Sequence, residues 1–536
     1  MNKARSNIVD RIVSYFNPVQ GAKRAAARGM VQVMASGYNH PGSRKHSMIK
    51  WSPSRYTADG ELVGKSEGLR AGARDLYMNT PIATAALRRT KTNVVGPGLK
   101  LQASIDSKAL NIDQDEAEIW QSKVEREFRH WCKHCDATGT DNFRTLQGLV
   151  FLSYLMSGDV FTIFRHTDKK QSPYKLALQI IEADQVGNPH GNINGKNWVM
   201  GVKLDVNDKP VAYHVKSWDP VKGEWFDKDD QTIPLYGERS GELNILHVFE
   251  RERPGQHRGI PMLAPVLLEL KQLSRLTEAE LMAAVVQSFL TIFVKSANPD
   301  GSPIHNFTTD ADAIEDADTN ANVGDEEENS LDGIEMGSGT MIQLDDGQSI
   351  DMADPSRPSG KFEPFFNALV KQIAASTGIT FEVLTQHFTS SYSASRAAIQ
   401  EAWKFFSDKR SFLIDKFCQP VYERFLVEAI ATGRVQAPGF FSDPIIRDAW
   451  CSATWTGRGQ GQLDPLKETK AARERIDANL STHETEAQRL GNDDWQNTPS
   501  VLQRENNLLI EHGLKPGGKN YGDDDPDVQQ SAKEEK

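Results

Sequence analysis

The stretch that decides the fold reads KFEPFFNALVKQIAASTGI over residues 361–379, TQHFTSSYSAS over 385–395 and RAAIQEAWKFFSDKRSFLIDKFCQPVYERFLVEAIATG over 396–433. Apolar side chains recur every three or four residues in the first run, which predicts a helix that ends at Gly378. The same spacing from Ile399 to Ile430 predicts one helix of roughly 55 Å, at 1.5 Å per residue. Pro420 lacks an N–H donor and is expected to kink it.

The segment between these helices, residues 385–395, is rich in Ser and Thr and contains no Asp, Glu, Lys or Arg. One or two of its serines are expected to cap the helix that follows. A serine nucleophile would need a G-x-S-x-G turn or a nearby oriented His, and neither accompanies these serines. A helix of this length directly after a loop without charged residues is unusual for a globular enzyme.

The composition of the whole chain bounds its class. With 536 residues, 38% hydrophobic and 25% charged, it suits a soluble protein of two to four structural units. Four cysteines without regular spacing predict a reducing compartment. The first twenty residues lack the apolar core of a signal peptide, and the longest apolar window, Leu281–Val294, is too short to span a bilayer. We therefore expect a cytoplasmic protein without a membrane segment.

The net charge of −11 is unevenly distributed along the chain. Sixteen Asp and Glu residues and no Lys or Arg lie between Lys295 and Arg357, so the remainder of the chain carries −11 + 16 = +5. The first sixty residues carry ten basic residues against Asp10 and Asp59. This separation of basic and acidic segments indicates both negatively and positively charged partners.

Helices and strands are both expected in the remainder of the chain, which predicts an α+β class. Helical patterns extend from Leu69 to Gly96, from an N-cap at Asp113, and from Pro261 to about Leu290. Between Asp159 and Glu250, runs such as VFTIFR and LNILHVFE predict strands, with a hairpin at Asn207-Asp208.

Metal and nucleotide sites have only weak candidates. The most metal-like cluster is His130, Cys132, His134 and Cys135, for which core packing is the better interpretation than zinc. Asp316, Asp318, Asn320 and Glu327 match four positions of a calcium-loop template, but this chain has Ala321 where the template requires glycine. The run Gly191–Asn197 has the wrong spacing for a phosphate-binding loop. We therefore predict no catalytic residue, no metal and no cofactor.

Several separated blocks resemble lambda-like phage portal proteins, in the right order from about Leu69 to Leu514. The carrying blocks are RDLYMNTPIATAAL (74–87), HVFERERPGQHRGIPMLAPVL (247–267), SSYSASRAAIQEAWKFF (390–406) and FCQPVYERFLVEAIATG (417–433). The resemblance implies an α+β portal fold with a mixed helix and strand wing, a two-helix stem, an inserted clip, a long helix buttressing the channel and a helical C-terminal region.

The expected boundaries are a basic flexible arm (1–60), the wing (61–258), the first stem helix (259–292), an acidic clip insertion (293–360), the second stem helix (361–380), the tunnel loop (381–395), the long kinked helix (396–433), C-terminal wing or crown helices (434–512) and a disordered tail (513–536).

The resemblance also implies the function: a dodecameric ring that nucleates the procapsid, docks the terminase, conducts DNA and binds the tail adaptor. The expected partners are eleven further copies of the chain, the terminase large subunit, the head-tail adaptor, the major capsid and scaffold proteins, and double-stranded DNA without sequence specificity. Its expected location is the capsid portal vertex, and the host cytoplasm during assembly.

Two sets of site residues follow from this expectation. Those expected to face DNA are Thr385, Gln386, His387, Thr389, Ser390, Ser391, Tyr392 and Ser393. Those expected to dock a partner are Asp325, Glu326, Glu327 and Glu328. Many relatives carry an acidic residue where this chain has His387, so the electrostatics of the loop differ here.

Two other functions remain open from the residues alone. Scattered acids could form the metal site of a DNA-processing enzyme, which nuclease activity in the purified chain would favour. A helical scaffold or adaptor that never surrounds DNA would also fit the helices, and particle images with a central hole would exclude it.

Overall fold

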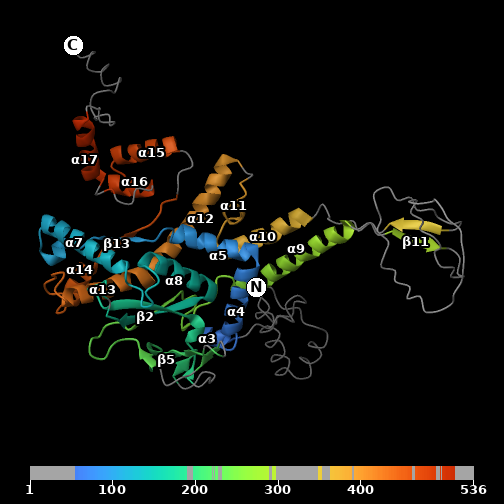
Figure 1. Cartoon of the computed structure of the whole chain (residues 1–536), viewed down its shortest axis with the longest axis horizontal. Helices are drawn as coiled ribbons and strands as arrows, with labels where there is room; N and C mark the ends of the chain where they lie inside the picture. Colours follow the sequence, from blue (N-terminus) through green and yellow to red (C-terminus); the bar gives the residue numbers. More distant parts are fainter. Residues whose placement is uncertain are drawn as a thin grey trace, which may run out of the picture. The chain divides into compact units, whose positions relative to one another are not determined.

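The computed structural model describes residues 55–168, 170–189, 197–219, 221, 224–226, 232–288, 292–296, 348–352, 362–388, 391–460, 465–490, 495 and 498–512. The chain divides into two compact units, one made of Met1–Pro265 with Thr377–Lys536 and the other of Val266–Ser376. Both units contain helices and strands, which confirms the mixed α+β class (Figure 1).

Helices dominate the start of the first unit: α3 (Ala58–Leu62), α4 (Ser66–Asn79), α5 (Pro81–Val94), α6 (Ser107–Leu110), α7 (Gln114–Cys132) and α8 (Phe143–Ser157). The run predicted as one helix from Leu69 to Gly96 is therefore two. Thr80 between them is extended, with φ −120° and ψ 114°, because a residue before proline disfavours the helical region. Pro81 then opens α5, where its missing N–H costs little.

Antiparallel sheets follow α8. The central strand β2 (Asp159–His166) pairs with β3 (Leu176–Glu182) and β10 (Ile245–Phe249). A second sheet has the order β4 (Trp198–Val199), β5 (Val202–Leu204), β6 (Pro210–His214) and β9 (Thr232–Pro234). A separate hairpin joins β7 (Ser217–Asp219) to β8 (Glu224–Phe226). Asp208 has φ 59° in the turn between β5 and β6, so the hairpin expected there is confirmed.

Aromatic side chains from distant parts of the sequence build the helical core of the first unit. The ring of Phe128 on α7 lies 5.5 Å from that of Tyr422 and 5.2 Å from that of Phe425, both on α13 (Gln419–Ala431). Phe143 on α8 lies 5.7 Å from Phe417. Strand β1 (Lys100–Ala103) also pairs with the late strand β13 (Ala453–Thr456). The C-terminal part of the chain therefore completes a core that the early helices begin.

The long helix predicted after the Ser-rich segment is present. It consists of α12 (Tyr392–Leu413), a π-helical turn η4 (Ile414–Cys418) and α13, and the residues at both joints keep right-handed helical angles. From Tyr392 to Ala431 it spans roughly 60 Å at 1.5 Å per residue. Pro420 cannot donate to the carbonyl four residues earlier and crowds it. A π-helical turn lies just before Pro420. Prolines and π turns are both places where helices kink, so the kink at this point stays a prediction.

The second unit contains α9 (Leu267–Ser288), β11 (Ile292–Ser296), β12 (Gln348–Met352) and α10 (Phe362–Thr377). A short 3-10 turn, Ala264–Val266, precedes α9, so Pro261 and Pro265 lie before the helix rather than in its first turn. β11 and β12 pair antiparallel with Ser296 opposite Gln348. The chain therefore leaves and re-enters this ladder at neighbouring points.

The C-terminal part of the first unit continues with α14 (Pro444–Cys451), α15 (Pro465–Asp477), α16 (His483–Arg489) and α17 (Thr498–Glu511). The side chain of Asp443 accepts a hydrogen bond from the amide of Ile445 and so caps α14. Within the described ranges, no helix has the length and apolar character needed to cross a membrane.

A buried ion pair fixes the chain segment that leads out of β10. Arg258 is 1% exposed and Asp159 is fully buried, and the guanidinium donates from Nε to the Asp159 carboxylate. The same guanidinium donates to the carbonyl oxygens of Ala183, Val186 and Met200. Burial alone would raise the pKa of the Asp159 carboxyl, but the neighbouring Arg258 guanidinium lowers it. Burial lowers the pKa of His247 to about 4, against the opposing hydrogen bond to Asp159.

Two glycines bring the backbones at this ion pair together. A β-carbon on Gly259 would lie 1.9 Å from the carbonyl oxygen of Gly158, and Gly158 has φ 86°. No larger residue fits at Gly259 without a backbone shift. The segment from Gln256 to Ile260 is therefore held to the start of β2 by both close backbone packing and the buried ion pair.

A second pair, between His257 and Asp59, fastens α3 to the same segment. His257 Nδ1 lies 2.7 Å from Asp59 Oδ2, its Nε2 lies 3.0 Å from the carbonyl oxygen of Asp208, and its amide donates to Asp59 Oδ1. The hydrogen bond to Asp59 raises the pKa of His257, against the opposing effect of burial. An imidazolium that donates from both nitrogens fits both acceptors.

We predict that this attachment weakens as the pH rises. Because the folded pKa of His257 lies above the unfolded one, its contribution is fully present below about pH 6.5 and decreases as the pH passes the folded pKa. Asp59→Asn should therefore cost about 1.5–3 kcal/mol of local stability at pH 6 and clearly less at pH 8. Hydrogen exchange of the α3 amides at the two pH values measures this.

Glu61→Gln is the matched control, because Glu61 lies on the same helix and pairs with the half-exposed Arg253. It should change α3 exchange little, and equally at both pH values. An Asp59→Asn loss that is the same at pH 6 and pH 8 would exclude His257 as the titrating group.

Candidate functional site

Gly378 fixes where the chain enters the candidate loop. It follows the last residue of α10 with φ 71°, as expected for a helix-ending glycine. A β-carbon on Gly378 would lie 2.8 Å from ring atom Cδ2 of Phe405 on α12, so the backbone approaches this ring closely. Thr380 also donates from Oγ1 to the Ala398 carbonyl oxygen, over 3.3 Å. The chain before the loop is thus attached to α12.

A short helix, α11 (Phe381–Thr385), occupies the first third of the segment expected to be loop. Leu384 is 1% exposed, and Arg89 on α5 donates from Nη1 to the Val383 carbonyl oxygen over 2.6 Å. α11 packs against both α5 and α12. The prediction of a loop from 381 was therefore wrong for these residues, because burial of Leu384 and the anchor from Arg89 stabilise a helical turn.

Arg89 is the residue of this site that the sequence did not reveal. It stands in the pair Arg88-Arg89 on a helix 294 positions before Val383. Two adjacent arginines on a helix normally indicate a solvated surface, and only the tertiary contact identifies Arg89 as an anchor of α11.

A short connection joins α11 to α12, and its described residues are exposed. Thr385 closes α11 by donating from Oγ1 to the Phe381 carbonyl oxygen, and Gln386 takes the left-handed conformation with φ 57°. Gln386, His387 and Ser391 are exposed, and Thr389 and Ser390 lie outside the described residues. No Asp, Glu, Lys or Arg occurs from Gln386 to Ser395.

The expectation that Tyr392 and Ser393 belong to the loop was wrong: α12 starts at Tyr392, so both lie in its first turn. No Gly or Pro interrupts the run from Ser391 to Phe406, so the helix extends back to the serines. Ser391 is the N-cap residue, but its side chain makes no capping hydrogen bond and lies with Oγ 3.3 Å from Ser393 Oγ. Both Tyr392 and Ser393 are exposed.

The second candidate set, Asp325, Glu326, Glu327 and Glu328, lies outside the described residues, as do Asp316, Asp318, Asn320 and Glu327 of the calcium template and residues 191–196 of the nucleotide candidate. Of the metal-like cluster, the rings of His130 and His134 lie 5.8 Å apart and Cys135 is buried. Across the described ranges, no three His, Cys, Asp or Glu side chains gather as a metal site would require.

The comparisons with known proteins identify the family of this chain. The family model described as phage portal protein, lambda family, matches residues 44–410, which is more than half of the sequence and includes the candidate loop. The chain belongs to the lambda family of phage portal proteins. The matched region includes α11, the exposed connection and α12 as far as Arg410.

Two individual portal proteins are similar to this chain over almost its full length. Portal protein B of Escherichia phage lambda is 24% identical over 527 residues, which cover 94% of this chain and 95% of the relative. The portal protein of Escherichia phage N15 is 25% identical over 505 residues, which cover 90% and 92% of the two chains. A chain from the neck of the native gene transfer agent particle has a TM-score of 0.41 at 11% identity, covering 85% of this portal protein and 96% of that chain.

Proposed function

We propose that this portal protein assembles as a dodecameric ring at the capsid vertex, and that residues 385–393 face the DNA that passes through it. Membership of the portal family supports the ring. The observation that carries the role of the loop is an exposed, uncharged connection between α11 and α12, attached to α5 and α12 at its entrance.

An uncharged lining suits a conduit through which DNA must slide. Each Lys or Arg that neutralises a phosphate releases counterions and so strengthens binding. A ring repeats every such contact in each subunit, and the DNA would then be held rather than passed. The side chains of Gln386, Ser391 and Ser393 can contact DNA by weak, sequence-independent hydrogen bonds. They lack the positive charge that would bind the phosphates strongly.

We further propose that α9 and α10 act as the two stem helices and that the acidic segment 293–360 is the clip. β11 and β12 support an insertion of this kind, because their pairing brings the two ends of the segment together. Residues 61–258 would form the wing, and residues 434–512 the C-terminal wing or crown helices. The clip would dock the terminase large subunit during packaging and the head-tail adaptor afterwards, and other surfaces would contact the capsid and scaffold proteins.

Class-averaged electron micrographs of the purified chain test the ring directly. We expect closed rings with a central channel wide enough for duplex DNA. Sedimentation that finds only monomer under packaging-like conditions, with no ring in assembled particles, would overturn the proposal. Nuclease assays with divalent metal on the same sample address the alternative of a DNA-processing enzyme.

Neutralising the acidic segment should weaken partner docking. Sixteen acids without Lys or Arg between Lys295 and Arg357 repel one another in a ring unless neighbouring basic residues, counterions or a basic partner surface balance them. Changing Asp325, Glu326, Glu327 and Glu328 to Asn or Gln should lower terminase or adaptor affinity about tenfold at low salt and flatten its salt dependence. Binding titrations at two ionic strengths measure both effects.

A matched control neutralises the four acids Asp523, Asp524, Asp525 and Asp527 near the C-terminus, which changes the net charge by the same amount. Ring formation should survive in both variants, because the apolar core lies elsewhere. Equal binding by the acidic-segment variant and the wild type at low salt would mean that this segment is only a solvated insertion.

A further inference from the structure

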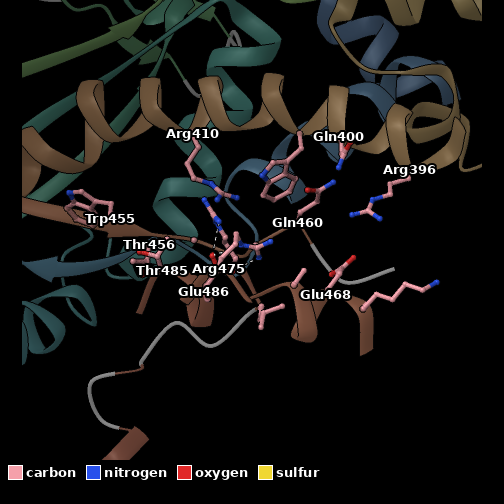
Figure 2. A pocket seen from close by; sticks show the side chains of 17 residues that line it. Arg396, Gln400, Arg410, Trp455, Thr456, Gln460, Glu468, Arg475, Thr485 and Glu486 are labelled. Carbon is pink, nitrogen blue, oxygen red and sulfur yellow. Dashed lines mark hydrogen bonds and ion pairs between the residues drawn. The ribbon is translucent and has the colours of Figure 1, made fainter. Parts of the chain in front are cut away.

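A pocket of about 740 Å³ opens between α12 and the C-terminal helices α15 and α16. Figure 2 shows Arg396, Gln400 and Arg410 on the long helix, across the pocket from Arg475 and Glu486. The end of β13 and the turn that follows it, through Gln460, complete the lining. Small-molecule sites commonly measure about 300–1,000 Å³, so a group the size of a nucleotide fits.

The lining of this pocket carries more positive than negative side chains. Among the described residues that line it, the cations are Arg396, Arg410, Lys467, Arg475 and Arg489, and the carboxylates are Glu468 and Glu486. This excess of cations attracts anions into the pocket.

The buried carboxylate of Glu486 keeps two of the arginines in place. Glu486 is 2% exposed, and Arg475 donates to its two oxygens over 2.9 and 2.6 Å. Arg489 donates to one of these oxygens over 2.9 Å. Arg475 in turn lowers the pKa of Glu486 to about 2, so the carboxylate stays ionised. One negative charge is thus shared by two guanidinium groups, and the local charge remains positive.

Arg410 lines the opposite side of the pocket, where hydrogen bonds to backbone carbonyls hold its side chain. Its Nε donates to the Val94 carbonyl oxygen over 3.0 Å, and its Nη2 donates to the carbonyl oxygens of Asn93 and Arg458 over 2.9 Å. The guanidinium also lies 5.2 Å from the ring centre of Trp403, which lines the pocket. These three acceptors are neutral carbonyls, and together they orient the guanidinium of Arg410.

We propose that this pocket binds a phosphate group, carried either by DNA or by a small phosphorylated molecule. The pocket lining offers four kinds of hydrogen-bond donor: guanidinium groups, the ammonium of Lys467, the amides of Gln400 and Gln460, and the hydroxyls of Thr456 and Thr485. A phosphate accepts from all of them, and the indole of Trp403 suits a nucleotide base beside it.

The test uses the full-length chain and the exposed cations Arg396 and Lys467, which lie on opposite walls of the pocket. Arg396→Gln with Lys467→Gln should lower affinity for a short DNA duplex at least about tenfold at low salt and reduce the slope of log K against log salt by about two. The matched control is Lys404→Gln with Lys470→Gln. It removes the same charge from the same two helices but leaves the pocket lining intact.

Inorganic pyrophosphate distinguishes the two sources of phosphate. Pocket-dependent binding of the duplex supports a DNA strand, and pocket-dependent binding of pyrophosphate alone supports a small molecule. Equal effects of the pocket and control variants on both probes would overturn the proposal. Preference for poly-glutamate over both probes would also overturn it, in favour of an acidic protein partner. Particle images report ring formation separately, so a failure here leaves the portal function untouched.

Discussion

Asp159→Asn is expected to destabilise the first unit by about 3–5 kcal/mol, because it leaves the Arg258 guanidinium charged, 1% exposed and without a carboxylate. Folded domains are stable by only about 5–15 kcal/mol, so much of the protein should fail to accumulate in soluble form. Urea unfolding followed by tryptophan fluorescence measures the loss, together with the soluble yield. We expect ring formation to fail with it, because the unit that would form most of the ring is then partly unfolded.

A double variant separates the ion pair from the rest of this network. Buried pairs can often be replaced by apolar residues without loss. Here Arg258 also satisfies the carbonyl oxygens of Ala183, Val186 and Met200, so Asp159→Asn with Arg258→Met should be at least as unstable as Asp159→Asn alone. Arg253→Gln is the control, because its partner Glu61 is 38% exposed, and its expected cost is below about 1 kcal/mol. A fully stable double variant would show that the carbonyls do not depend on Arg258.

Elements with a strong local signal could be predicted from the sequence. The helix ending at Gly378, the long helix after the serines and the hairpin at Asp208 each depend on residues close in sequence, and the structure contains all three. The break at Thr80 was missed although Pro81 signals it, because the apolar spacing continues across it. The π turn before Pro420 was not predicted, because the sequence alone does not show how a helix accommodates a proline.

The position of the candidate site could be predicted from the sequence, but the contacts that hold it in place could not. Uncharged residues between two helical runs located the exposed connection. Its anchors are contacts between distant residues, Arg89 with Val383 and Phe405 with Gly378, and no local pattern encodes such pairs. The same holds for β1 and β13, which pair residues about 350 positions apart. The cations that line the pocket likewise come from α12, α15 and α16, which are far apart in the sequence.

Replacing Ser390, Ser391 and Ser393 by Lys should stall DNA packaging while leaving the protein folded. Ser391 and Ser393 are exposed at the start of α12, so the substitutions add charge without burying it. In the proposed ring, three cations per subunit would surround the DNA and bind its phosphates with counterion release. We expect the packaging rate to fall at least about tenfold at low salt and to recover partly as salt screens the contacts. In vitro packaging with purified terminase and procapsids measures the rate.

Replacing the same three serines by Asn provides the matched control, because it changes side-chain size and hydrogen bonding but adds no charge. This variant should package DNA at close to the wild-type rate, and both variants should form rings with unchanged thermal stability. If the Asn and Lys variants slow packaging equally, shape rather than charge governs passage at this segment. If the Lys variant packages at the wild-type rate at low salt, residues 390–393 do not face the DNA, and the exposed connection between α11 and α12 must serve another surface of the ring.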